Sequence, residues 1–120
     1  MTNSGKECFQ IAVIVPVYNA ADTLGECLSS ILRSGLVAAA NVVVVDNGST
    51  DLSTDVARRH GVTQLWTSKR GPGAARNIGL AYIEESTPDF IAFVDADAVL
   101  CDGWIEKAVG FLSCRPDAAG

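Results

Sequence analysis

Short apolar runs alternate along the chain with segments of helical periodicity. The first run, 11–17, is short and β-branched, which indicates a buried strand. The second run, 41–46, lacks polar alternation, as expected of a strand that is covered on both faces. A weaker run at 62–68 and a further run at 89–97 complete the set of predicted strands.

Helical patterns separate these runs. In the first pattern, apolar residues recur at i, i+3, i+4, i+7 and i+8 until about Gly35. The second predicted helix ends at Gly61, the third starts with Gly-Pro-Gly and continues to about Glu85, and the last covers 103–114. This alternation of strands and helices predicts an α/β fold with a mostly parallel, doubly wound sheet, an α/β/α sandwich. The apolar face of the first helix consists of Leu24, Cys27, Leu28, Ile31 and Leu32.

The composition fits one small domain. The chain has 120 residues, of which 48% are hydrophobic, and no apolar run reaches the roughly 18 residues that span a bilayer. The polar start "MTNSGKECFQ" does not resemble a signal peptide, so we expect a cytoplasmic location and cysteines that remain thiols. We expect residues 1–9 to form a tail and residues 10–120 to form the domain.

The charge of the chain restricts its partners. The formal net charge is −5 and there is no basic run, which argues against nucleic acid, because nucleic-acid binding depends on neutralising phosphates. The same negative charge repels a nucleotide, so a nucleotide site must supply positive charge locally.

Polar and glycine-rich segments follow each predicted strand. They read "PVYNA", "DNGSTD", "SKRGPGAAR" and "DADA" in chain order. In open parallel sheets, ligands bind beyond the carboxyl ends of the strands, where the strand order reverses. We therefore predict one site that all of these loops share.

The third predicted helix carries its charges against the helix dipole. Basic residues crowd its start and acidic residues close its end, where the dipole favours the opposite signs. A bound anion at the start would remove the conflict, and Gly71 and Gly73 would allow its close approach. A tolerated surface charge pattern is the alternative. The residues concerned are Lys69, Arg70, Arg76, Glu84 and Glu85.

Asp95 and Asp97 close the last apolar run. Residues two apart in a strand point to the same face, so the carboxylates would lie side by side if the strand extends that far. Like charges that close raise each other's pKa unless a cation lies between them. The pair therefore predicts a cation site, with a solvated strand end as the alternative.

The segments "VIVPVYNA", "VVVVDNGSTD", "GPGAARNIGL" and "FVDADAVL" together resemble the nucleotide-binding half of a family 2 glycosyltransferase with the Rossmann-like GT-A fold. The resemblance covers roughly residues 10–115. It implies transfer of a sugar from a nucleotide-diphosphate sugar, with a UDP-sugar favoured, to an unidentified acceptor. It also implies a divalent cofactor, Mn²⁺ or Mg²⁺, held at the D-x-D motif.

The resemblance also implies roles for particular residues. Pro16, Val17 and Tyr18 match the segment that lines the base pocket, with Tyr18 packing on the nucleobase. Asp46 matches the carboxylate that hydrogen-bonds the base edge, and Asn47 stands where many relatives have a second aspartate.

The remaining implied roles concern the rest of the donor. Arg76 matches a segment that faces the nucleotide, at its uracil or its phosphates. Asp95 matches the residue near the ribose, and Asp97 matches the metal ligand.

In the family, the acceptor-binding region and the catalytic base lie well beyond the D-x-D strand. We therefore expect the chain to be a donor-binding portion that transfers sugar poorly or not at all alone. We also expect an apolar sheet edge that favours self-association, and for a full-length protein an association with the cytoplasmic face of a membrane. The stereochemical outcome, inverting or retaining, stays open.

Other classes of protein compete with this interpretation. A phosphoacceptor receiver domain needs acidic residues after its first strand, where this chain has "PVYNA". A dinucleotide oxidoreductase needs G-x-G-x-x-G after its first strand, whereas here the motif follows the third strand and Arg76 replaces its last glycine. A non-catalytic nucleotide-sugar-binding module or a truncated product remains an alternative.

Overall fold

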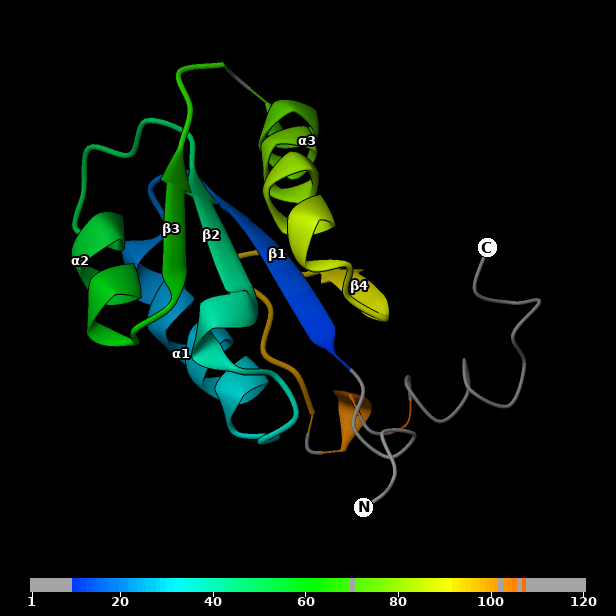
Figure 1. The fold of residues 1–120 in the computed structure, drawn as a ribbon. Coiled ribbons are helices and arrows are strands. Elements are labelled where there is room, and N and C mark those ends of the chain that lie inside the picture. Colours follow the sequence, from blue (N-terminus) through cyan, green and yellow to red (C-terminus); the bar gives the residue numbers. More distant parts are fainter. Residues whose placement is uncertain (1–9, 70, 102, 106, 108–120) are drawn as a thin grey trace.

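The computed structural model contains a four-stranded parallel sheet with helices on both faces (Figure 1). It describes residues 10–69, 71–101, 103–105 and 107. The strand order is β3-β2-β1-β4. The predicted α/β class and doubly wound parallel sheet are therefore confirmed. The strands are β1 (Ile11–Val17), β2 (Val42–Asp46), β3 (Thr63–Trp66) and β4 (Phe90–Phe93).

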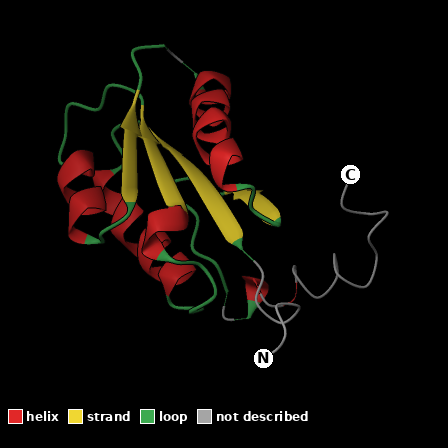
Figure 2. Ribbon diagram, in the orientation of Figure 1, coloured by secondary structure: helices red, strands yellow, loops and turns green. Residues whose placement is uncertain are grey.

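Helices cover the two faces of this sheet unequally (Figure 2). Helices α1 (Ala21–Leu32) and α2 (Ser53–Arg59) contact each other on one face, and α3 (Pro72–Ile83) packs on β1 and β2 from the other face. Short 3₁₀ turns occur at Ala39–Asn41 (η2) and Glu84–Ser86 (η3). In the described part of the chain, every helix is too short or too polar to cross a membrane.

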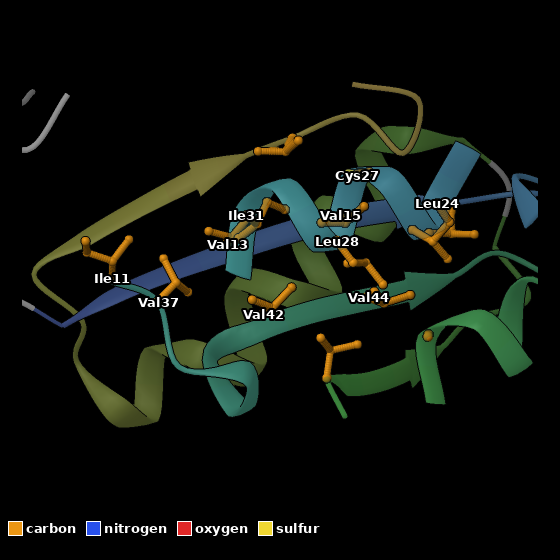
Figure 3. Packing of buried hydrophobic residues seen from close by; sticks show 14 of the residues in the cluster. Ile11, Val13, Val15, Leu24, Cys27, Leu28, Ile31, Val37, Val42 and Val44 are labelled. Carbon is orange, nitrogen blue, oxygen red and sulfur yellow. The ribbon is translucent and has the colours of Figure 1, made fainter. Parts of the chain in front are cut away.

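Strand β1 contributes to both layers of the core. Val13 and Val15 point toward α1, where they join the larger buried cluster (Figure 3). Ala12 and Ile14 join a second cluster with residues of α3, because successive side chains of a strand point to opposite faces. This burial on both faces explains why the first apolar run shows no polar alternation.

The carboxyl ends of the central strands lie level with one another. Asp46, the last residue of β2, is the register partner of Val17 in β1 and of Trp66 in β3. The loops that follow these strands therefore leave the sheet at one edge, as predicted. This edge is called the carboxyl edge below.

Strand β4 ends earlier than predicted, at Phe93 rather than at residue 97. Its ladder with β1 stops at the pair Ile14–Phe93, and the last contact is the Val94 amide donating to the Ile14 carbonyl at 3.0 Å. The chain then forms a turn in which the Ala98 amide donates to the Asp95 carbonyl at 3.0 Å. The condition under which Asp95 and Asp97 would share one face of a strand is therefore not met, and the predicted strand end at residue 97 is wrong.

The other predicted boundaries fit to different degrees. Strand β3 ends at Trp66 rather than at residue 68. Residues 104 and 105 are helical, as predicted for the last helix, but most of that helix and the predicted tail 1–9 lie outside the described residues. At the edge strand β4, Ile91 and Phe93 are exposed, so self-association through this edge stays a prediction.

Candidate functional site

The loops that follow β1 and β2 are joined by hydrogen bonds between them. The Asn19 amide donates to Ser49 Oγ at 2.8 Å, and the Thr50 amide donates back to Asn19 Oδ1 at 2.8 Å. Asn19 has a φ of 50°, a left-handed conformation that asparagine tolerates better than most residues. Because these bonds run in both directions, the two loops hold one another in place.

The same loop after β2 also caps α1. The Ala20 amide donates to Ser53 Oγ at 2.9 Å, and the Ala21 amide donates to Asp51 Oδ2 at 3.1 Å. Ala20, at the N-cap position of α1, has no side chain that could supply such an acceptor. The sequence alone does not indicate this role, because Asp51 and Ser53 lie two residues before α2 and at its first position, where they suggest caps of that helix.

Asp46 is buried at the carboxyl edge with one oxygen free. The residue is 8% exposed, and its Oδ2 accepts a hydrogen bond from the Ser49 amide at 3.1 Å. Its Oδ1 is fully buried and has no hydrogen-bond partner among the described residues. An unpartnered buried acceptor costs about 1–3 kcal/mol, so a local rearrangement that brings this atom to an N–H group of a ligand would be favourable.

Asn47 connects β2 to the start of α3. Its amide donates to the Val17 carbonyl at 2.8 Å, and its Nδ2 donates to the Gly71 carbonyl at 3.3 Å. Gly71 has a φ of 98°, which a residue with a side chain adopts only with strain. The loop before α3 is thus fixed close to Asp46.

The remaining residues predicted for the base pocket lie at the end of β1. Val17 is buried as the register partner of Asp46, and Pro16 pairs with Val45. Tyr18 follows the strand and is 50% exposed, so part of its surface is accessible to a ligand. The structure therefore brings Tyr18 and Asp46 to the ends of neighbouring strands.

Basic side chains flank the start of α3. Lys69 and Arg76 are both exposed, while the predicted Arg70 lies outside the described residues. The Arg76 guanidinium lies 5.8 Å from the ring centroid of Phe93, within the range of a cation–π contact. This contact places Arg76 at the end of β4, the strand that leads to the acidic turn.

The turn at residues 95–98, called the acidic turn below, carries two exposed carboxylates. Burial, then the charges of Asp97 and Asp95, raise the pKa of the Cys27 thiol from 9.0 to about 11. Both carboxylates therefore act electrostatically on the same buried thiol of α1.

The donor set of the acidic turn fits a hard divalent cation. Carboxylate oxygens are the ligands that Mg²⁺ and Mn²⁺ prefer, and Mg²⁺ is commonly held by one or two carboxylates together with substrate phosphates. The described residues contain no group of three or more His, Cys, Asp or Glu side chains that could enclose a metal by themselves. A cation here would complete its coordination with water or with oxygens of a bound phosphate.

The fold and the carboxyl edge define a doubly wound α/β protein with a nucleotide-binding type of strand order. Strands β1, β2 and β3 follow one another in one direction across the sheet, and β4 lies on the other side of β1. The strand order thus reverses between β1 and β4, the position at which doubly wound α/β proteins bind nucleotides.

Comparison with known proteins identifies the family. The sequence profile of Glycosyl transferase family 2 matches residues 12–119. The chain belongs to this family, as its sequence motifs predict.

Curated relatives agree with this assignment. The chain is 33% identical to glycosyltransferase AglE of Haloferax volcanii over 110 residues, 86% of this chain and 35% of AglE. It is 36% identical to the pre-mycofactocin glycosyltransferase of Mycobacterium tuberculosis over 120 residues, 97% of this chain and 23% of that protein. The chain thus spans well under half the length of these relatives.

Solved structures share the fold. The chain matches Staphylococcus aureus TarS 1–349 in complex with UDP-GlcNAc with a TM-score of 0.73 and 26% identity, covering 87% of this chain and 31% of that one. It also matches glucosyl-3-phosphoglycerate synthase of Mycobacterium tuberculosis, solved with Mn²⁺, UDP and phosphoglyceric acid, with a TM-score of 0.69 and 24% identity over 90% of this chain and 40% of that one. The second match supports the fold alone.

Proposed function

We propose that this chain is the donor-binding part of a family 2 glycosyltransferase and that it holds a nucleotide-diphosphate sugar, with a UDP-sugar favoured, at the carboxyl edge. The observation that carries the proposal is the buried, unpartnered Oδ1 of Asp46. The similarity to TarS, which was solved with UDP-GlcNAc, supports the choice of donor. Transfer of the sugar to an acceptor is proposed for the whole protein.

Asp46 and Tyr18 would recognise the base. Uracil carries one N–H group between two carbonyl groups, and Asp46 Oδ1 is an ionised acceptor that such a group can satisfy. A hydrogen bond to a charged group contributes about 1.5–3 kcal/mol. The half-exposed ring of Tyr18, at the end of the neighbouring strand, would pack on the face of the base.

The acidic turn and α3 would bind the rest of the donor. Asp95 would contact the ribose, and Asp97 would hold Mn²⁺ or Mg²⁺ against the diphosphate. Bound there, the cation supplies Lewis-acid stabilisation of the charge on the departing nucleoside diphosphate. Arg76 and Lys69 would add positive charge near the diphosphate, which a chain of net charge −5 must provide locally.

Calorimetric titration with UDP tests the proposal. We expect wild type to bind UDP, and more tightly with Mn²⁺ than with EDTA. Asp46→Asn should weaken UDP binding at least about 5-fold in both conditions, because it replaces a charged acceptor with a neutral one. Asp97→Asn should abolish only the gain from Mn²⁺.

Asp55→Asn is the matched control, since Asp55 is an acidic residue of α2 that pairs with Arg58 at 2.8 Å. This variant should bind UDP as wild type does. Absence of UDP binding by folded wild type, or an equal loss in the control variant, would contradict the proposal.

A further inference from the structure

Helix α1 holds both ends of the acidic turn. At the start of the turn, the Cys27 thiol donates to the Asp95 carbonyl with a sulfur–oxygen distance of 3.4 Å. Beyond its end, the Leu100 amide donates to Ser30 Oγ at 3.0 Å. Cys27 is 0% exposed and Ser30 is 6% exposed, so the α1 side of each bond is buried.

Cys27 and Ser30 are adjacent on α1 and are hydrogen-bonded to each other. They are three positions apart in the helix and therefore lie on the same face. Ser30 Oγ also donates to the Cys27 carbonyl at 2.7 Å, which directs the hydroxyl hydrogen into the helix and leaves a lone pair for the Leu100 amide. A purely apolar contact would not need a serine that is buried to this extent.

The chain between the two attachment points has a fixed orientation. Ala96, Ala98 and Leu100 are partly buried against the core cluster on the α1 face. Asp95 and Asp97, which alternate with them, are exposed. Since these apolar residues pack against the α1 face, the carboxylates are left accessible from solvent.

We propose that Cys27 and Ser30 are positioning residues, which hold the acidic turn so that Asp97 and Asp95 can bind a divalent cation. The inference rests on the proposed function of the carboxyl edge, but it concerns different residues. It assigns a role to two side chains of α1 that contact neither nucleotide nor metal themselves.

Variants of the two residues test this role. We expect Cys27→Ala and Ser30→Ala to reduce the Mn²⁺-dependent gain in UDP affinity about 3–10-fold, the effect of losing one or two hydrogen bonds. UDP affinity in EDTA should stay within about 2-fold of wild type, because the base site is unchanged. Cys27→Ser, which restores an O–H donor, should recover at least half of the lost gain.

A control and a second readout keep the outcomes distinct. Ser34→Ala removes a hydroxyl that follows α1, donates to the Ile31 carbonyl at 3.0 Å and accepts from the Leu36 amide at 3.1 Å. Because both bonds are local, this variant should leave the Mn²⁺-dependent gain unchanged. Titration with Mn²⁺ alone, followed by electron paramagnetic resonance, should show weaker binding in Cys27→Ala and Ser30→Ala than in wild type. If the cavity left by Cys27→Ala prevents folding, Cys27→Val, which also lacks a hydrogen-bond donor, takes its place.

The results separate the two proposals. Wild type that binds Mn²⁺ but no UDP contradicts the proposed function, while the Mn²⁺ titrations still decide the role of Cys27 and Ser30. Folded variants with wild-type Mn²⁺ affinity and wild-type Mn²⁺-dependent gain overturn the positioning role. Wild type that binds no Mn²⁺ overturns it as well.

Discussion

Asp51 uses both of its carboxylate oxygens to connect two loops. Its Oδ1 accepts hydrogen bonds from the Ser53 hydroxyl at 2.6 Å and the Ser53 amide at 3.0 Å, and its Oδ2 accepts the Ala21 amide. The Ser53 hydroxyl bond is the main reason that the pKa of Asp51 is lowered from 3.8, followed by the backbone bonds. These bonds favour the ionised form in the folded state.

This lowered pKa predicts how stability depends on pH. A carboxyl whose pKa is lower in the folded state stabilises the fold above its unfolded pKa, and this contribution is lost as pH falls through the folded pKa. We expect the free energy of unfolding of Asp51→Asn to decrease less steeply than that of wild type as pH falls below about 4. Urea denaturation at a series of pH values between about 3 and 7 measures this free energy. Parallel loss of stability in Asp51→Asn and wild type over this pH range would contradict the role of these hydrogen bonds.

At this scale the sequence predicted which residues gather at the carboxyl edge, but not their partners. Tyr18 and Asp46 could be placed because each directly follows or closes an apolar run. The Asn19–Ser49 and Cys27–Asp95 bonds join residues 30 and 68 positions apart, so only the folded chain brings them together. Cys27 was correctly predicted to lie on the apolar face of a helix, but that position gives no indication of its hydrogen bond to the Asp95 carbonyl.

Helix α3 packs closely on β1 at Gly79. A Cβ atom added to this glycine would lie 2.7 Å from Ile14 Cγ2, a distance that requires Ile14 or the helix to move. Ile14 is 0% exposed and belongs to the core between α3 and the sheet, so there is little room for such a shift. The absence of a side chain at Gly79 sets the distance between this helix and the sheet.

We therefore expect Gly79→Ala to destabilise the fold by about 1–3 kcal/mol through overpacking, measured by urea denaturation. Gly73→Ala is the matched control in the same helix, because a Cβ there meets nothing within 4 Å. That variant should gain up to about 1 kcal/mol from higher helix propensity. Equal effects of the two substitutions would contradict this account of the packing.

The length of β4 illustrates what periodicity leaves open. The apolar run continues past Phe93, so the sequence alone favours a longer strand. The observed end depends on pairing with β1 and on the attachment of the following turn to α1. Both are long-range contacts, whereas the central strands β1 and β2 lie close to their predicted bounds because both of their faces are buried.

The proposed site draws on both layers of the molecule. The acidic turn is held by α1 on one face of the sheet, and Arg76 belongs to α3 on the other face. A donor that contacts both would join layers that have separate buried clusters. Binding should therefore stabilise the whole domain rather than one loop.

A thermal melt measures this effect. A ligand at 100 times its dissociation constant stabilises the folded state by about 2.7 kcal/mol, which should raise Tm by several degrees in a domain of this size. We expect UDP with Mn²⁺ to raise the Tm of wild type as a single transition. In Asp97→Asn, UDP should raise Tm by the same amount with Mn²⁺ as with EDTA. A second transition that does not respond to UDP would contradict coupling of the two layers.

Hydrogen bonds of Asn19, Asp51 and Ser53 fix the segments after β1 and β2 to one another. An insertion in either segment would break contacts of the other, so length variation should be tolerated elsewhere on the surface first. Attempts to change donor preference by recombination would accordingly have to exchange both segments as a matched pair.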